Sequence, residues 1–96
     1  LSSEDWVVFV QGHAAVGEKS RDGRDAFELS AARASAVARS LIRRGVRANK
    51  VTTVFYGDTR PVSVPGRSQV ESDRLSRRVE FMIRKSDLLA PGNKAQ

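Results

Sequence analysis

The feature that most constrains the fold is one long amphipathic segment, which runs from Asp25 to Gly45. Asp25 is placed as an N-cap, and Glu28 three residues later predicts a capping box. Gly45 is placed to end the helix in the left-handed conformation. At about 100° per residue, one apolar arc forms on this helix. Its members are Leu29, Ala34, Val37 and Leu41.

Arg33 lies inside this apolar arc, one turn after Leu29 and one turn before Val37. A guanidinium beside a core face is unfavourable unless it meets an anion or several acceptors. Two interpretations stay open from the pattern. Arg33 can extend to the rim of the stripe and pair with a carboxylate of its own chain, or it can receive an anion from outside the molecule.

The segments on either side of this helix predict strands. Residues 5–11 carry the apolar run WVVFV, which predicts a central strand covered on both faces. Residues 51–56 are rich in β-branched and aromatic side chains, which favour a strand. Strand, helix and strand at this spacing predict a βαβ unit with parallel strands. Residues 69–75 can form a helical turn, and residues 77–85 alternate as a strand with one lightly covered face.

The predicted fold class is therefore α/β, in a single domain, because 96 residues suffice for one modest core. We expect the domain to cover residues 1–86, with residues 87–96 as a flexible tail. Three strands and one long helix leave one sheet face under-covered. We expect a further helix, and a further strand, from sequence before Leu1 or from a partner.

No apolar run approaches the roughly 18 to 20 residues that span a bilayer, so membrane contact is expected only through the rest of the parent protein.

The composition narrows the classes of function. The net charge is +6, from 17 Lys and Arg against 11 Asp and Glu. A positive charge favours an anionic partner but does not identify its class. Aromatic side chains are few and Trp6 and Phe9 sit in the core-like run, which argues against a base-stacking platform. A non-specific phosphate-binding face stays open, but we expect no nucleic-acid partner. The chain has no cysteine, and the single histidine, His13, has no nucleophile motif beside it. We therefore expect no enzyme activity, no metal site and no cofactor.

Four stretches occur in an order and at a spacing that together resemble a known family. They are VVFVQGH (Val7 to His13), FELSAARASAV (Phe27 to Val37), FYGDTRPV (Phe55 to Val62) and SRRVEFMI (Ser76 to Ile83). The chain resembles the OmpA-like peptidoglycan-binding domain, most closely the version at the C-terminus of the flagellar stator protein MotB. The resemblance implies an α+β sandwich, with an OmpA-like βαβ core, a mixed sheet and helices on one face. The first strand and helix of the family precede VVFV and are missing from this chain.

This resemblance also implies a function and a set of site residues. Such a module lies in the periplasm of a Gram-negative bacterium and anchors a membrane-bound protein to the cell wall. In the family, the arginine of LSxxRA binds the carboxylate of diaminopimelate in the peptidoglycan stem peptide, and here that arginine is Arg33. Arg77 matches the first arginine of the family's NRRVE motif, which also approaches the ligand, and His13 stands in its GH motif. Other envelope proteins or a second copy of the chain are further expected partners.

The chain departs from the family motifs at three positions near this expected site. Ala15 replaces the aspartate that would hold the ammonium of the ligand, and Ala26 and Ser76 replace two asparagines. The loop after GH is also longer. Either an acidic residue of that loop reaches in to meet the amine, or the domain has lost wall binding and acts as a protein-interaction or assembly module in a stator or secretion machine. The loop residues in question are Glu18, Asp22 and Asp25.

Overall fold

The computed structural model describes residues 6–85. In chain order, its elements are β1 (Trp6–Gly12), α1 (Ala26–Arg43), the 3-10 turn η2 (Ala48–Lys50), β2 (Val51–Phe55), α2 (Gln69–Ser76) and β3 (Val79–Lys85). The predicted α/β class is confirmed, as are the long helix, the three strands and the helical turn. The predicted tail at residues 87–96 lies outside the described residues.

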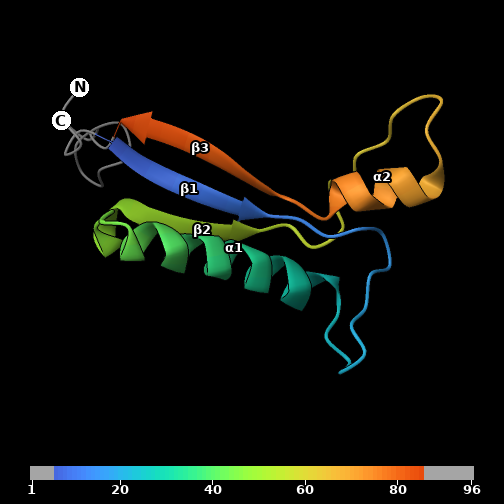
Figure 1. The fold of residues 1–96 in the computed structure, drawn as a ribbon, viewed down its shortest axis with the longest axis horizontal. Helices are drawn as coiled ribbons and strands as arrows, with labels where there is room; N and C mark the ends of the chain where they lie inside the picture. The colour runs from blue at the N-terminus through green and yellow to red at the C-terminus, as the bar shows by residue number, and fades with distance from the viewer. Residues whose placement is uncertain (1–5, 86–96) are drawn as a thin grey trace, which may run out of the picture.

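The three strands form one mixed sheet in the order β2-β1-β3. β1 pairs in parallel with β2 and antiparallel with β3, so that Val10 lies between Thr53 and Phe81. The parallel pair joined through α1 is the predicted βαβ unit. In Figure 1, α1 lies along one face of the sheet, whereas α2 lies beyond the end of the sheet, close to the start of β3.

Both ends of α1 carry the signals that the sequence predicts. The backbone N–H of Glu28 donates to Oδ1 of Asp25 at 2.9 Å, and the N–H of Asp25 donates to Oε1 of Glu28 at 3.0 Å. This is a complete capping box. The helix stops at Arg43, and Gly45 follows with φ at 109°, a conformation that favours glycine.

The core is thin because α1 packs very closely on β1. A Cβ atom added at Gly12 would lie 2.0 Å from the carbonyl oxygen of Ser30. The most buried line on α1 consequently consists of small side chains: Ala26, Ser30, Ala34 and Ala38. The larger members of the predicted apolar arc, Leu29, Val37 and Leu41, are half-buried. Arg33 therefore lies at the edge of the buried line rather than in its centre.

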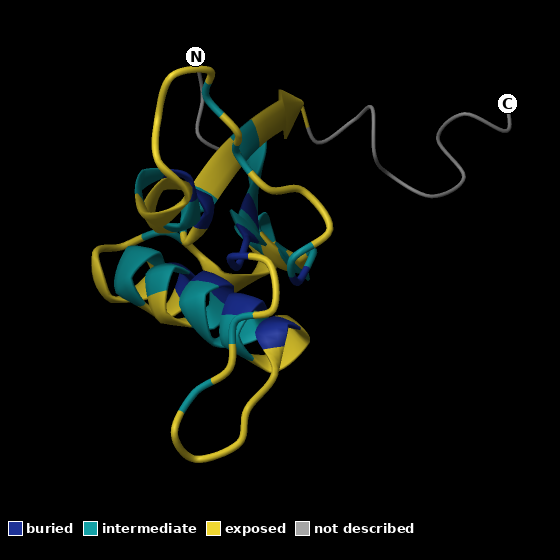
Figure 2. Cartoon of the chain, turned by 90° about the vertical axis from the view of Figure 1, so that its right-hand side faces the viewer, coloured by how far each residue is buried: buried dark blue, intermediate teal, exposed yellow. Residues whose placement is uncertain are grey.

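The prediction that β1 is covered on both faces is wrong for the described part of the chain. Val7 and Phe9 alternate with the core residue Val10, so they point away from α1, and they are half-buried. On the α1 side, β3 carries Phe81 and Ile83, which are 55% and 60% exposed because α1 lies over β1 and β2. Figure 2 shows β3 largely in the colour of exposed residues. No described element lies over the face of the sheet opposite α1, so the expected under-covered face is observed within residues 6–85.

Candidate functional site

The loop that follows β1 begins inside the molecule. The backbone N–H of His13 donates to the carbonyl of Arg78 at 2.9 Å, and that of Ala14 donates to the carbonyl of Gly57 at 2.8 Å. His13, Ala14 and Ala15 are all buried. These bonds fix the start of the loop between the segment after β2 and the segment before β3.

A turn over residues 15–18 then brings Glu18 back toward the sheet. The N–H of Glu18 donates to the carbonyl of Ala15 at 3.0 Å, and the N–H of Ala15 donates to Oε1 of Glu18, also at 3.0 Å. Gly17 occupies the third position of the turn with φ at 70°, where glycine is favoured. The N–H of Gly17 donates to Oδ2 of Asp58 at 2.9 Å, which joins the turn to the loop after β2.

Arg33 projects from α1 into this turn and binds a carboxylate. Its Nη1 donates to Oε1 of Glu18 at 2.9 Å and to the carbonyl oxygen of His13 at 3.0 Å. Its Nη2 donates to Oε2 of Glu18. Two parallel bonds to the two oxygens of one carboxylate are the geometry in which arginine recognises carboxylates. The side chains of Arg33 and Glu18 are 28% and 17% exposed, so the pair lies at the surface end of the core.

A second arginine acts on the same carboxylate. The hydrogen bond from Arg33 lowers the pKa of Glu18 below its ordinary value of 4.5, against the opposing effect of burial. The N–H of Ala15 and the charges of Arg33 and Arg77 lower the pKa further. Arg77 is exposed and caps the C-terminus of α2. The two arginines predicted as site residues therefore both stabilise one ionised carboxylate.

The two predicted aspartates are engaged elsewhere. Asp22 accepts hydrogen bonds from the Ser20 hydroxyl and from Nε of Arg24, and Asp25 caps α1. Among the described residues, the acidic side chain that hydrogen-bonds Arg33 is Glu18. Of the two interpretations of Arg33, this structure therefore has the one in which the partner comes from its own chain.

The ring of His13 lies away from this pairing. It stacks on Tyr56 with 5.0 Å between ring centroids, and Cζ of Arg60 lies 4.0 Å from the Tyr56 centroid. Neither ring nitrogen has a hydrogen-bond partner within the described residues. The nearest carboxylate oxygen given for Nε2 is Oε1 of Glu80, at 3.6 Å, which is longer than a hydrogen bond. Burial and then the charge of Arg78 lower the pKa of His13 from its ordinary value of 6.5. His13 thus contributes its carbonyl oxygen, rather than its ring, to the position of Arg33.

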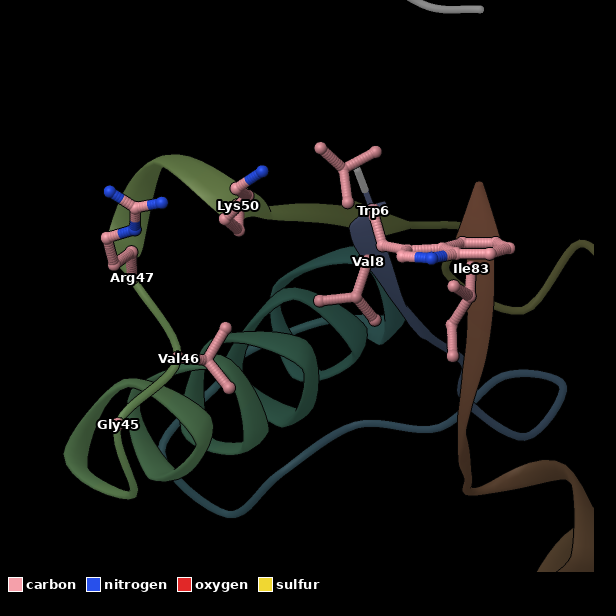
Figure 3. Close-up of a pocket in the computed structure, with 8 residues that line it drawn as sticks. Trp6, Val8, Gly45, Val46, Arg47, Lys50 and Ile83 are labelled. Carbon is pink, nitrogen blue, oxygen red and sulfur yellow. The ribbon is translucent and has the colours of Figure 1, made fainter. Parts of the chain in front are cut away.

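A cavity of about 320 Å³ lies at the opposite end of the sheet, near the start of β1. Figure 3 shows it between Trp6 and Ile83 on one side and the segment after α1, with Val46 and Lys50, on the other. Arg33 is not among its lining residues.

Within residues 6–85, no cluster of three or more His, Asp or Glu side chains is placed to hold a metal ion. No helix in that range combines the length and hydrophobicity of a membrane span.

Two parts of this arrangement escape the sequence argument. The donor role of the Ala15 N–H was not predicted, because backbone donors carry no residue signature. The tie from Asp58 to Gly17 was also missed, since the two residues are 41 positions apart and no motif joins them. A signal did exist for the turn, because Gly17 directly before Glu18 favours a turn that returns the glutamate to Ala15.

The fold and these motifs belong to a known class of domain. The OmpA family model matches residues 2–74, and the chain is therefore a member of the OmpA family. Within this class, it is similar to the protein MotB. The crystal structure of the periplasmic domain of Helicobacter pylori MotB aligns with a TM-score of 0.72 and 27% identity, over 90% of this chain and 55% of that chain.

A crystal structure of the C-terminal domain of Helicobacter pylori MotB aligns with a TM-score of 0.71 and 31% identity, over 88% of this chain and 64% of that one. The chain thus spans less than two thirds of either solved chain. A search of curated protein sequences gives no match. The predicted likeness to the OmpA family, and within it to MotB, is confirmed.

Proposed function

We propose that this domain is a non-catalytic module that binds peptidoglycan by a carboxylate of the stem peptide and so anchors an envelope protein to the cell wall. The observation that carries the proposal is the fork of Arg33, which is held at the edge of the core and is already arranged on a carboxylate. A planar guanidinium fixed in this way selects a carboxylate over a spherical anion, because its two donors match the two oxygens.

The surroundings of Arg33 support the same ligand chemistry. The N–H of Ala15 supplies a third donor to the carboxylate, and Arg77 adds a second positive charge that acts on it. The side chain of Ala15 offers no acceptor for an ammonium, and Asp22 and Asp25 are engaged in other hydrogen bonds. The proposal therefore assigns the carboxylate of a diaminopimelate-type stem to Arg33 and leaves its amine to the solvent. The similarity to the periplasmic domain of MotB supports a place in the periplasm of a Gram-negative bacterium.

Co-sedimentation with purified sacculi tests this proposal. The Arg33→Ala chain should be retained about tenfold less than the native chain, since one lost charge-assisted fork removes more than about 1.4 kcal/mol of binding. Arg39→Ala is the matched control, because Arg39 is exposed on the same helix, and its retention should equal that of the native chain. Equal retention of the native and Arg33→Ala chains overturns the proposal.

A second candidate function is a protein-interaction or assembly module that has lost wall binding. It is favoured by the pairing of Arg33 with Glu18, which fills the site from within, and by the exposed Phe81 and Ile83 on β3. The two candidates differ in their response to a soluble stem peptide at millimolar concentration. Amide resonance shifts around Arg33 and Ala15 support the wall-binding module, and unchanged resonances support the assembly module.

A further inference from the structure

The proposed binding site already holds a carboxylate, and that carboxylate belongs to the chain itself. Both oxygens of Glu18 lie on Nη1 and Nη2 of Arg33, and Oε1 also accepts the N–H of Ala15. A ligand carboxylate that uses the same fork needs the same two guanidinium donors. Glu18 and an external carboxylate therefore exclude one another at this site.

Arg33 makes two hydrogen bonds to Glu18 and one hydrogen bond that does not involve Glu18. Nη1 also donates to the carbonyl oxygen of His13 at 3.0 Å, and His13 is fixed by its own bond to Arg78. This bond does not involve Glu18, so it stays available to the guanidinium when another carboxylate takes the place of Glu18.

The turn that carries Glu18 starts at the buried Ala15 and reaches outward to an exposed tip. Its tip is Gly17, and a Cβ atom at that position would meet nothing within 4 Å, so the tip lies in open space. One hydrogen bond to the Asp58 carboxylate joins the tip to the neighbouring loop. The displacement of Glu18 breaks its bonds to Arg33 and Ala15, and an incoming carboxylate replaces these bonds in kind.

We propose that Glu18 is an internal competitor for the carboxylate site, so that the domain exists in a closed form with Glu18 on Arg33 and in an open form that accepts a stem carboxylate. This inference rests on the proposed function, because it assigns a regulation to the same site. Closed chains do not bind, so the apparent affinity for the ligand falls in proportion to the open fraction. A tethered carboxylate competes at an effective concentration of the order of millimolar.

The test is a titration of the full chain with a synthetic stem tripeptide that ends in diaminopimelate, followed by amide resonance shifts. Glu18→Gln keeps the size of the side chain and removes its charge, and Glu18→Ala removes the side chain. Both should bind the tripeptide about fivefold or more tightly than the native chain, the lower end of typical coupling between two ligands. Asp22→Asn is the matched control, since Asp22 is a carboxylate of the same loop that bonds Ser20 and Arg24, and its affinity should be native.

Parallel co-sedimentation of the same chains with sacculi separates this inference from the proposed function, with thermal unfolding to confirm that each variant is folded. If sacculi retain the native chain and all chains bind the tripeptide equally, wall binding stands and the competition is overturned. If the two Glu18 variants bind and the native chain does not, the competition is supported and wall binding by the native chain fails. If no chain binds either probe, both proposals are overturned.

Discussion

Two titratable side chains of the loop after β1, Glu18 and His13, affect folding in different pH ranges. The folded-state pKa of Glu18 lies below 4.5, so its pairing stabilises the fold above pH 4.5 and is lost as the pH falls through the folded value. The pKa of His13 is also lowered, but histidine is a base, so its protonation at low pH destabilises the fold. The folded state disfavours the charged ring, so His13 costs stability once the unfolded chain binds a proton, which begins below about pH 6.5.

The effect of His13 can be measured by urea unfolding between pH 7.5 and 5. We expect the free energy of unfolding to fall with decreasing pH below about 6.5, by at most about 1.4 kcal/mol per pH unit for one proton. The groups near the ring are Arg78, Glu80, Arg60 and the stacked Tyr56. His13→Phe keeps an aromatic ring in the stack and cannot be protonated, so its profile should be flatter in this range. A native profile that is flat from pH 7.5 to 5 contradicts the burial of a neutral ring.

At the scale of elements, the close contact of α1 with β1 decides the shape of the core. Gly12 faces the backbone of Ser30, and the helix face toward the sheet consists of alanines and a serine. The capping box and Gly45 are local signals, so the helix ends were predictable. The depth of burial along the helix depends on the missing side chain at Gly12, which no helical periodicity reveals, so the pattern does not show that Ser30, Ala34 and Ala38 are the most deeply buried residues.

The contact at Gly12 makes a prediction about stability. Gly12→Ala should lower the free energy of unfolding by about 3 kcal/mol or more, because the new methyl group meets backbone atoms of α1 that cannot rotate away. Gly45→Ala is the matched control, since no atom lies within 4 Å of its Cβ position and the cost is one left-handed alanine, about 1–2 kcal/mol. Urea unfolding compares the two variants. A smaller loss for Gly12→Ala than for Gly45→Ala contradicts the close packing of α1 on β1.

At the scale of the whole molecule, the Arg33 site and the cavity lie at different ends of the sheet. The Arg33 site lies where β1 ends, and the cavity beside Trp6 and Ile83 lies where β1 begins. The sequence predicted Arg33 and Arg77 as site residues through the family resemblance. It predicted that an acidic residue of the loop, Glu18, Asp22 or Asp25, meets the amine of the ligand, whereas in the structure Glu18 binds Arg33 directly. The turn at Gly17 returns Glu18 to Ala15, a loop geometry that the residue types do not reveal.

Both proposals depend on the claim that Arg33 binds carboxylates and that Glu18 occupies its fork. The most direct measurement is the titration of the Glu18 side-chain carboxyl carbon by NMR, in the native chain and in the Arg33→Gln chain. We predict a midpoint below 4.5 in the native chain and a clearly higher midpoint once the guanidinium is removed, because the hydrogen bond from Arg33 is the largest cause of the lowered pKa. Identical midpoints in the two chains would contradict the claim.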